Sequence, residues 1–218
     1  LNGFDQTIGS LVVQTNNNAV ANNIIVDTGK TLTINGAVTL GVNANESDTN
    51  LNASGGGAIL VNSGNANFQI GAATVDNENR VDVDFTGLAS FTANLGTGTF
   101  RLGDPNTGTG NSTSTFKLAQ NNQITAALIR IGDGTGGSNT HTLTLGSGSN
   151  ALNADTINIG STGTTIRSGG AVVFDALDTT GAVTIRASDG TSRATINVIN
   201  TAGSTAGDMN SNLDFTGH

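Results

Sequence analysis

The chain has 218 residues, of which 31 are Gly, one is Pro and none is Cys, Trp or Tyr, and its formal net charge is −8. With only eight Lys and Arg there is no basic stripe to neutralise phosphates, so we expect neither nucleic acid nor an anionic membrane surface as a partner. The lack of Cys excludes disulfides and thiolate metal sites, and no apolar stretch approaches the roughly 20 residues of a membrane-spanning helix.

Short runs of alternating apolar and polar residues follow one another along the chain, each bounded by Gly, Asn or Asp. In chain order they cover 31–36, 37–41, 80–85, 98–103, 140–146, 155–160, 182–188 and 193–200. Within 80–85, Val and Phe alternate with Arg and Asp, which predicts a strand with one buried face. No window shows the helical period, so we predict an all-β protein.

A branched apolar residue followed by Gly recurs about every 30 residues. The copies are Ile8-Gly9, Leu40-Gly41, Ile70-Gly71, Leu102-Gly103, Ile131-Gly132 and Ile159-Gly160. A period of this length with short strands is typical of stacked coils. We therefore predict a parallel β-solenoid of about seven coils, each of roughly 28–32 residues and with two or three short strands.

A longer repeat connects two distant parts of the chain. The sequence "VDVDFTGL" at 81–88 returns as "SNLDFTGH" at 211–218, 130 residues later. We expect these to mark equivalent places in a superrepeat that runs from 85 to 215. Residues 1–218 are then a single β-solenoid segment of a longer repeat array.

Several phrases carry a resemblance to a known family: "LNGFDQTIGSL", "ITAALIRIGDGTGGSNTHTLTLGSG", "AVTIRASDGTSRATINV" and "LDFTG". Together they resemble the repeat regions of large bacterial surface proteins with autotransporter-associated β-strand repeats. The resemblance implies a right-handed parallel β-helix that is secreted or displayed at the cell surface as a stalk, adhesin or extracellular fibre. The chain lacks the Lys-Xaa-Gly-Xaa-Gly-Thr block that the commonest form of this repeat carries.

The most notable acidic cluster is Asp76, Glu78, Asp82 and Asp84. Asp82 and Asp84 share a strand face, so their carboxyl groups are expected about 6–7 Å apart, within the range used in glycoside hydrolysis. The simpler interpretation is that they are solvated outer-face charges that face Arg80 or Arg101 on neighbouring coils. We favour this interpretation and keep a β-helix glycan hydrolase or lyase as a remote alternative.

Other candidate residues give weaker signals. His141 is expected at the surface, on the polar side of its strand with Asn139, and "GSGSN" at 146–150 lacks the final Gly of a nucleophile turn. Asp104, Asn106, Asp133 and Asn139 offer oxygen ligands in Gly-rich loops, which leaves calcium binding open, although neither loop has the acidic groups of established calcium repeats. The Thr31/Thr33 and Thr140/Thr142/Thr144 series are expected to be ordinary outer-face threonines. We assign no catalytic residue, metal or cofactor.

These observations favour a structural protein over an enzyme. We expect a segment of a long extracellular or cell-surface fibre or stalk, which associates end to end with neighbouring repeats or subunits. An adhesin that binds cell-surface or matrix glycans is the alternative, although the absence of Trp and Tyr removes the usual aromatic platform.

Overall fold

The computed structural model describes residues 3–14, 21–41, 48–71, 80–103, 113–132, 139–160, 168–199 and 210–218. All regular structure in these ranges is β-strand, as the alternating sequence runs predict. All eight predicted runs contain strands. Within the same ranges there is no helix that is long and apolar enough to cross a membrane.

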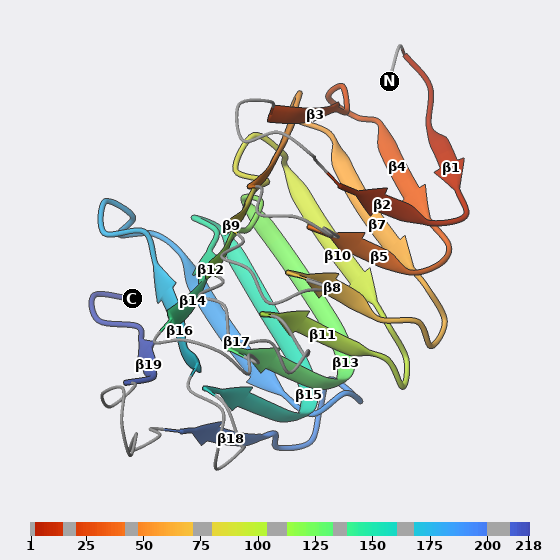
Figure 1. Ribbon diagram of the computed structural model, residues 1–218. Helices are drawn as coiled ribbons and strands as arrows, with labels where there is room; N and C mark the ends of the chain where they lie inside the picture. Colours follow the sequence, from red (N-terminus) through yellow and green to blue (C-terminus); the bar gives the residue numbers. More distant parts are fainter. Residues whose placement is uncertain are drawn as a thin grey trace.

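The chain winds through three rows of strands, and each turn adds one strand to every row (Figure 1). The first row contains β1 (Gln6–Ile8), β4 (Thr31–Ile34), β7 (Ala58–Asn62), β10 (Ser90–Asn94), the first halves of β13 (Asn121–Ile131) and β15 (Ser149–Ile159), and β17 (Ala182–Arg186). The second row contains β2 (Leu11–Val13), β5 (Val38–Leu40), β8 (Phe68–Ile70), β11 (Thr99–Leu102), the second halves of β13 and β15, and β18 (Thr195–Val198).

The third row contains β3 (Ala21–Ile25), β6 (Thr49–Ser54), β9 (Arg80–Asp84), β12 (Thr113–Lys117), β14 (Asn139–Leu145), β16 (Ser168–Phe174) and β19 (Asn212–Asp214). This row forms a 7-stranded sheet, while the first two rows together form a 12-stranded sheet. Figure 1 shows the two sheets on opposite sides of the molecule, with the strands of each row stacked in chain order.

Every pairing between these strands that the structure describes is parallel, so the fold is the predicted β-solenoid with three strands in each turn. Five inner turns pair with neighbours on both sides. Strands β1–β3 and β17–β19 pair on one side only among the described residues. The structure therefore has about five complete turns, fewer than the seven predicted, because the count from the sequence included the two end layers.

The apolar residues of the apolar-Gly repeat are paired with one another on successive strands of the second row. Leu40, Ile70, Leu102, Ile131 and Ile159 lie directly beside one another on successive turns, and all five are fully buried. The first predicted copy is wrong: Ile8 belongs to the first row and pairs with Ile34, while the neighbour of Leu40 is Val13. An apolar-Gly dipeptide arises easily in a chain with 31 Gly, which explains the false match.

The glycine that follows each of these side chains makes the corner toward the third row. Gly41, Gly71, Gly103, Gly132 and Gly160 all have positive φ angles, between 79° and 124°. At Gly71, a Cβ atom would also lie 2.5 Å from Oγ of Ser114 on the next turn. The repeat therefore requires glycine for both its backbone conformation and its lack of a side chain.

Aromatic side chains fill the widest part of the interior. Phe68, Phe85, Phe91, Phe100 and Phe116 are buried and form one cluster, with ring centroids as close as 5.0 Å. They come from both sheets, so their packing joins the sheets across the interior. The cluster contains edge-to-face pairs, a geometry that aromatic rings prefer, together with stacked pairs such as Phe68 and Phe100.

The two copies of "DFTG" make the same kind of corner. Oδ1 of Asp84 accepts hydrogen bonds from the backbone N and Oγ1 of Thr86, at 2.8 and 2.6 Å. Asp214 holds Thr216 through the same two bonds. Each corner follows a third-row strand, β9 or β19, and the two strands are four positions apart in the 7-stranded sheet. The longer array and its superrepeat stay predictions.

Candidate functional site

A polar groove on the outer face of the 7-stranded sheet is the main candidate for a binding site. It has a volume of about 450 Å³ and crosses β6, β9, β12 and β14. Most of its lining is polar: Asn50, Asn52, Arg80, Asp82, Asp84, Thr115, Lys117, Thr142 and Thr144. These side chains point outward because they alternate with buried residues such as Val83 and Phe116.

Parallel register brings these polar side chains together. Asp82 lies beside Asn50 on one side and Thr115 on the other, and Thr115 lies beside Thr142. Two residues further along each strand, Asp84 lies beside Lys117. The groove is therefore a ladder of amides, carboxylates, hydroxyls and one ammonium group, which can donate and accept hydrogen bonds along the stacking direction.

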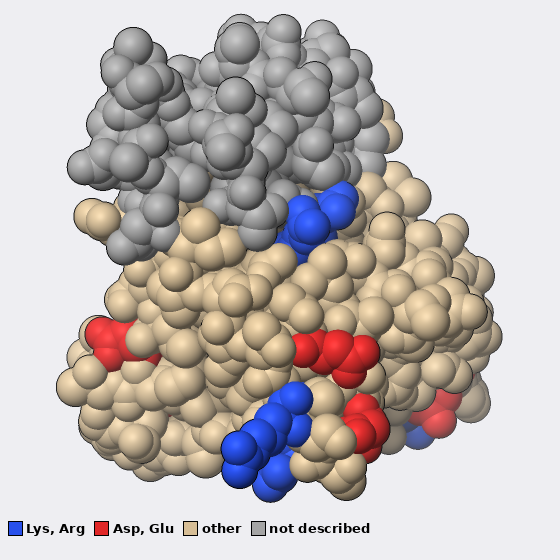
Figure 2. Space-filling model, turned by 90° about the horizontal axis from the view of Figure 1, so that it is seen from below, with Lys and Arg blue, Asp and Glu red and all other residues tan. Residues whose placement is uncertain are grey.

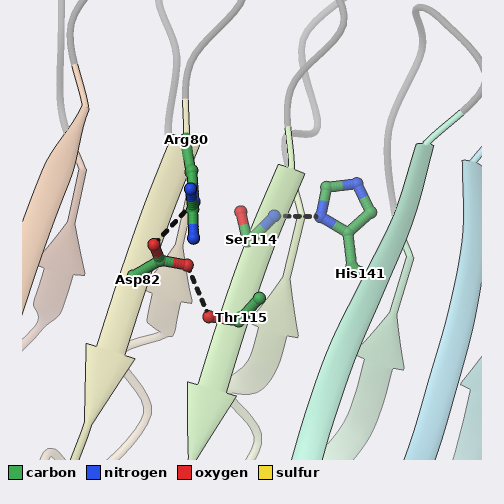
Figure 3. A network of polar contacts seen from close by, with 5 residues as sticks. All are labelled: Arg80, Asp82, Ser114, Thr115 and His141. Carbon is green, nitrogen blue, oxygen red and sulfur yellow. Dashed lines mark hydrogen bonds and ion pairs between the residues drawn. The ribbon is translucent and has the colours of Figure 1, made fainter.

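The carboxylate of Asp82 is held by two partners (Figure 3). Its Oδ2 lies 2.6 Å from Nε of Arg80 on the same strand, and its Oδ1 accepts a hydrogen bond of 2.6 Å from Oγ1 of Thr115 on the next turn. The Arg80 side chain is 63% exposed, so solvent screens this ion pair and its contribution to stability is small.

The prediction that Asp82 and Asp84 face Arg80 or Arg101 on neighbouring coils is therefore correct only in part. Asp82 and Asp84 lie on the outer face, as predicted, and Asp82 does face Arg80, although Arg80 is on its own strand rather than on a neighbouring coil. Arg101 is on β11 in the 12-stranded sheet and does not belong to this face. The carboxylate of Asp84 accepts hydrogen bonds from Thr86. Asp76 and Glu78 lie outside the described residues.

The predicted surface position of His141 is wrong. Its side chain is only 1% exposed, and its Nδ1 accepts a hydrogen bond of 3.1 Å from the backbone N of Ser114 (Figure 3). Burial lowers the pKa of His141 from 6.5 to about 4, because the imidazolium form would lose its hydration. A signal was present in the sequence: His141, Leu143 and Leu145 are two residues apart and therefore share one face of the strand.

The predicted calcium loops cannot be placed. Asp104, Asn106 and Asp133 lie outside the described residues, as does the side chain of Asn139. Within the ranges that are described, no group of three or more His, Asp or Glu side chains is arranged to hold a metal ion.

The segment "GSGSN" at 146–150 takes part in a buried hydrogen-bond network around Asn150. Asn150 is buried, and its amide oxygen accepts hydrogen bonds from the backbone N of Gly146 and from the buried amide of Asn122, at 2.9 and 2.8 Å. Its Nδ2 donates to the carbonyl oxygen of Gly146 at 2.8 Å. Sequence reasoning missed this amide pair, although Asn122 and Asn150 are spaced by one turn of the register.

The threonine series do not form continuous ladders. Thr33 lies between Thr7 and Leu60 on the first row. Thr142 lies between Thr115 and Ala171 on the third row. Both series are thus outer-face threonines within mixed rows, as predicted.

No family model, no curated protein and no solved structure matches this chain.

Proposed function

We propose that this chain is a structural β-solenoid segment of a long extracellular or cell-surface protein, and that it provides length and stiffness in a stalk or fibre. The observation that carries the proposal is the unbroken register of three strand rows from β1 to β19. Each turn is fixed by its neighbours, so added turns lengthen the rod without changing its cross-section.

Stiffness is expected from the way successive turns are joined. Three parallel ladders connect each inner turn to the next, and the interior between them is filled by Val, Ile, Leu and Phe. Bending such a rod would have to open ladder hydrogen bonds or core contacts on one side. In the described inner strands the backbone is already paired on both sides, so a protease would have to open the ladders to bind these strands, which suits a protein outside the cell.

Localisation and partners belong to this proposal. The resemblance to autotransporter-associated repeats supports an extracellular or bacterial cell-surface location. The one-sided end strands support association end to end with neighbouring repeats or subunits.

Electron microscopy of the native protein tests the proposal. We expect long, uniform filaments whose density repeats at about 4.8 Å along the axis, the spacing of stacked strands. Compact single particles would overturn the stalk or fibre function.

The polar groove supports a second candidate function, adhesion to a cell-surface or matrix glycan. Its amides, hydroxyls and charged groups offer the hydrogen bonds that sugar hydroxyls require. If the native protein forms compact particles, binding to immobilised glycans becomes the decisive measurement. Asp82→Asn, which removes the charge beside Arg80 and Thr115, should then weaken binding, whereas Ala151→Ser on the opposite sheet should not.

A further inference from the structure

The two ends of the solenoid expose matching sets of half-buried side chains. The partly buried apolar residues that pack against the core fall into two groups. Ile8, Leu11 and Ile24 belong to the first layer of strands, β1–β3. Val183, Ile185, Leu213 and Phe215 belong to the last layer, β17–β19, and the corner after it. In the inner turns, the equivalent positions are covered by the next layer.

The register shows which residues of the two ends are equivalent. In the first row, the inner column that begins at Ile8 ends at Ile185. In the second row, the column that begins at Val13 ends at Val198. The column that begins at Leu11 ends at Ile196.

Continuing most inner columns by one layer puts apolar side chains against apolar side chains, whereas Val183 would meet Gln6 and Leu213 would meet Asn22. If a second copy follows in the same register, its Ile8 lies beside Ile185 and its Val13 beside Val198. In the third row, where Leu213 ends the column that begins at Asn22, the same shift brings Phe215 beside Ile24. Ile196 and Val198 are 39% and 46% exposed, and the added layer would cover them.

None of the six end strands contains Lys or Pro, two of the features that prevent edge pairing, although β1, β2 and β19 are only three residues long. Natural edge strands carry Lys, Pro or other devices that block the addition of another strand. The sequences QTI, LVV and ANNII at one end contain no charged residue and no Pro. The strands at the other end contain only Arg186 and Asp214 as charges, and both are exposed on the outer face. Between the described end strands, no like charges would therefore face each other.

Surface charge is consistent with this arrangement. Figure 2 views the molecule from the side on which β18 lies in Figure 1, and most of the described surface there is uncharged. The Lys, Arg, Asp and Glu side chains form small, separate groups rather than a continuous field. On this described surface no concentrated charge of one sign faces a second copy, although each copy carries a formal net charge of −8.

We propose that the β17–β18–β19 end of one copy pairs with the β1–β2–β3 end of a second copy of this chain, in parallel and in the register of the internal turns. This inference rests on the proposed structural function and specifies its partner and geometry. The contact is heterologous and head to tail, so it leaves both outer ends open and generates a filament rather than a closed dimer. Each copy adds seven strand layers, or about 34 Å of length.

Disulfide cross-linking tests the register, because the natural chain contains no Cys. Thr7 and Thr184 are exposed outer-face residues at the two ends of a single column. They are six layers apart within one molecule, about 29 Å, so they cannot pair within a chain. Across the proposed junction they are direct neighbours, about 4.8 Å apart, which is within disulfide range.

We expect oxidised Thr7→Cys/Thr184→Cys to run as a ladder of dimers, trimers and longer species on a non-reducing gel. Thr7→Cys/Arg186→Cys is the matched control, because its second cysteine is two residues out of register and about 8 Å away, beyond disulfide reach. It should give at least tenfold less cross-linked product. The single Thr7→Cys variant should give no species beyond a dimer.

Three outcomes would overturn the proposed junction: equal ladders from both double variants, efficient dimers from Thr7→Cys alone, or no ladder from a double variant that retains its β-sheet circular dichroism. These outcomes are separate from the test of the structural function. If microscopy of the native protein shows filaments but the ladder is absent, the register is wrong and the fibre function stands. If the ladder forms but the native protein is compact, the fibre function is wrong.

Discussion

His141 is a titratable side chain enclosed by the solenoid, and it bonds to the backbone through a neutral ring nitrogen. Its pKa falls from 6.5 in the unfolded chain to about 4 in the folded one, so the unfolded chain binds the extra proton in this range. We predict that its contribution to stability is complete above pH 6.5 and decreases as the pH falls toward 4, by up to about 3 kcal/mol. Urea unfolding across this pH range measures the effect.

The control is His141→Asn, whose amide oxygen can still accept the hydrogen bond from Ser114 but does not titrate. The difference in unfolding free energy between the two proteins should grow with pH from 4 to 6.5 and then stay constant. An equal pH dependence in both proteins would show that His141 is not the group responsible.

The corner glycines act at the scale of the element, since they connect the second row to the third. Gly71→Ala should reduce the free energy of unfolding by about 2–3 kcal/mol, because alanine is strained at a φ of 79° and its Cβ would meet Oγ of Ser114. Gly64→Ala is the matched control: its φ is 71°, and nothing lies within 4 Å of the added Cβ. It should cost only about 1 kcal/mol. Chemical denaturation measures both.

A double variant separates the two effects at this corner. Ser114→Ala removes the oxygen that lies nearest the added Cβ, and the next nearest atom, the backbone carbonyl carbon of Gly103, is 3.5 Å away. In this background, Gly71→Ala should cost no more than Gly64→Ala. If Gly71→Ala and Gly64→Ala cost the same in the natural background, contact with the next turn does not explain the glycine repeat.

At the scale of the whole molecule, stability should decrease from the middle turns toward both ends. Strand β13 pairs along its length with β10 and β11 on one side and β15 on the other, whereas β18 pairs with β15 alone in the described chain. All four residues of β18 are exposed. Because each layer is stabilised by its neighbours, local opening should begin at the end layers.

Hydrogen exchange of the monomeric protein, at concentrations too low for the proposed end-to-end pairing, measures this gradient by mass spectrometry. Amides of β13 should exchange at least 100-fold more slowly than those of β18, a ratio that corresponds to about 2.7 kcal/mol of difference in opening free energy. Uniform protection of both strands would contradict the nearest-neighbour description of the fold.

Local pattern and spacing were enough to predict the fold class, the period of about 30 residues and the outer face of the acidic strand, but left open whether a turn has two strands or three. Successive side chains of a strand point to opposite faces, so Val83 points inward while Asp82 and Asp84 point outward. The period of the apolar-Gly pairs follows from stacking in register, since each turn must bring Leu40, Ile70 and Leu102 to the same place. These features depend on local pattern and spacing, which the sequence contains directly.

The pairing between turns, which the sequence does not contain directly, assigns each phrase to its row and each buried polar group to its partner. Ile8-Gly9 and Leu40-Gly41 have similar sequences, but Ile8 lies in the first row of strands and Leu40 lies in the second. Alternation puts His141 on the face of Leu143 and Leu145, but its hydrogen-bond partner Ser114 is 27 residues earlier in the chain and is brought to it only by the pairing between turns. The reason is physical: the neighbour above or below a residue is one turn away, and corner lengths vary from turn to turn, so contacts across turns are fixed only when the whole stack forms.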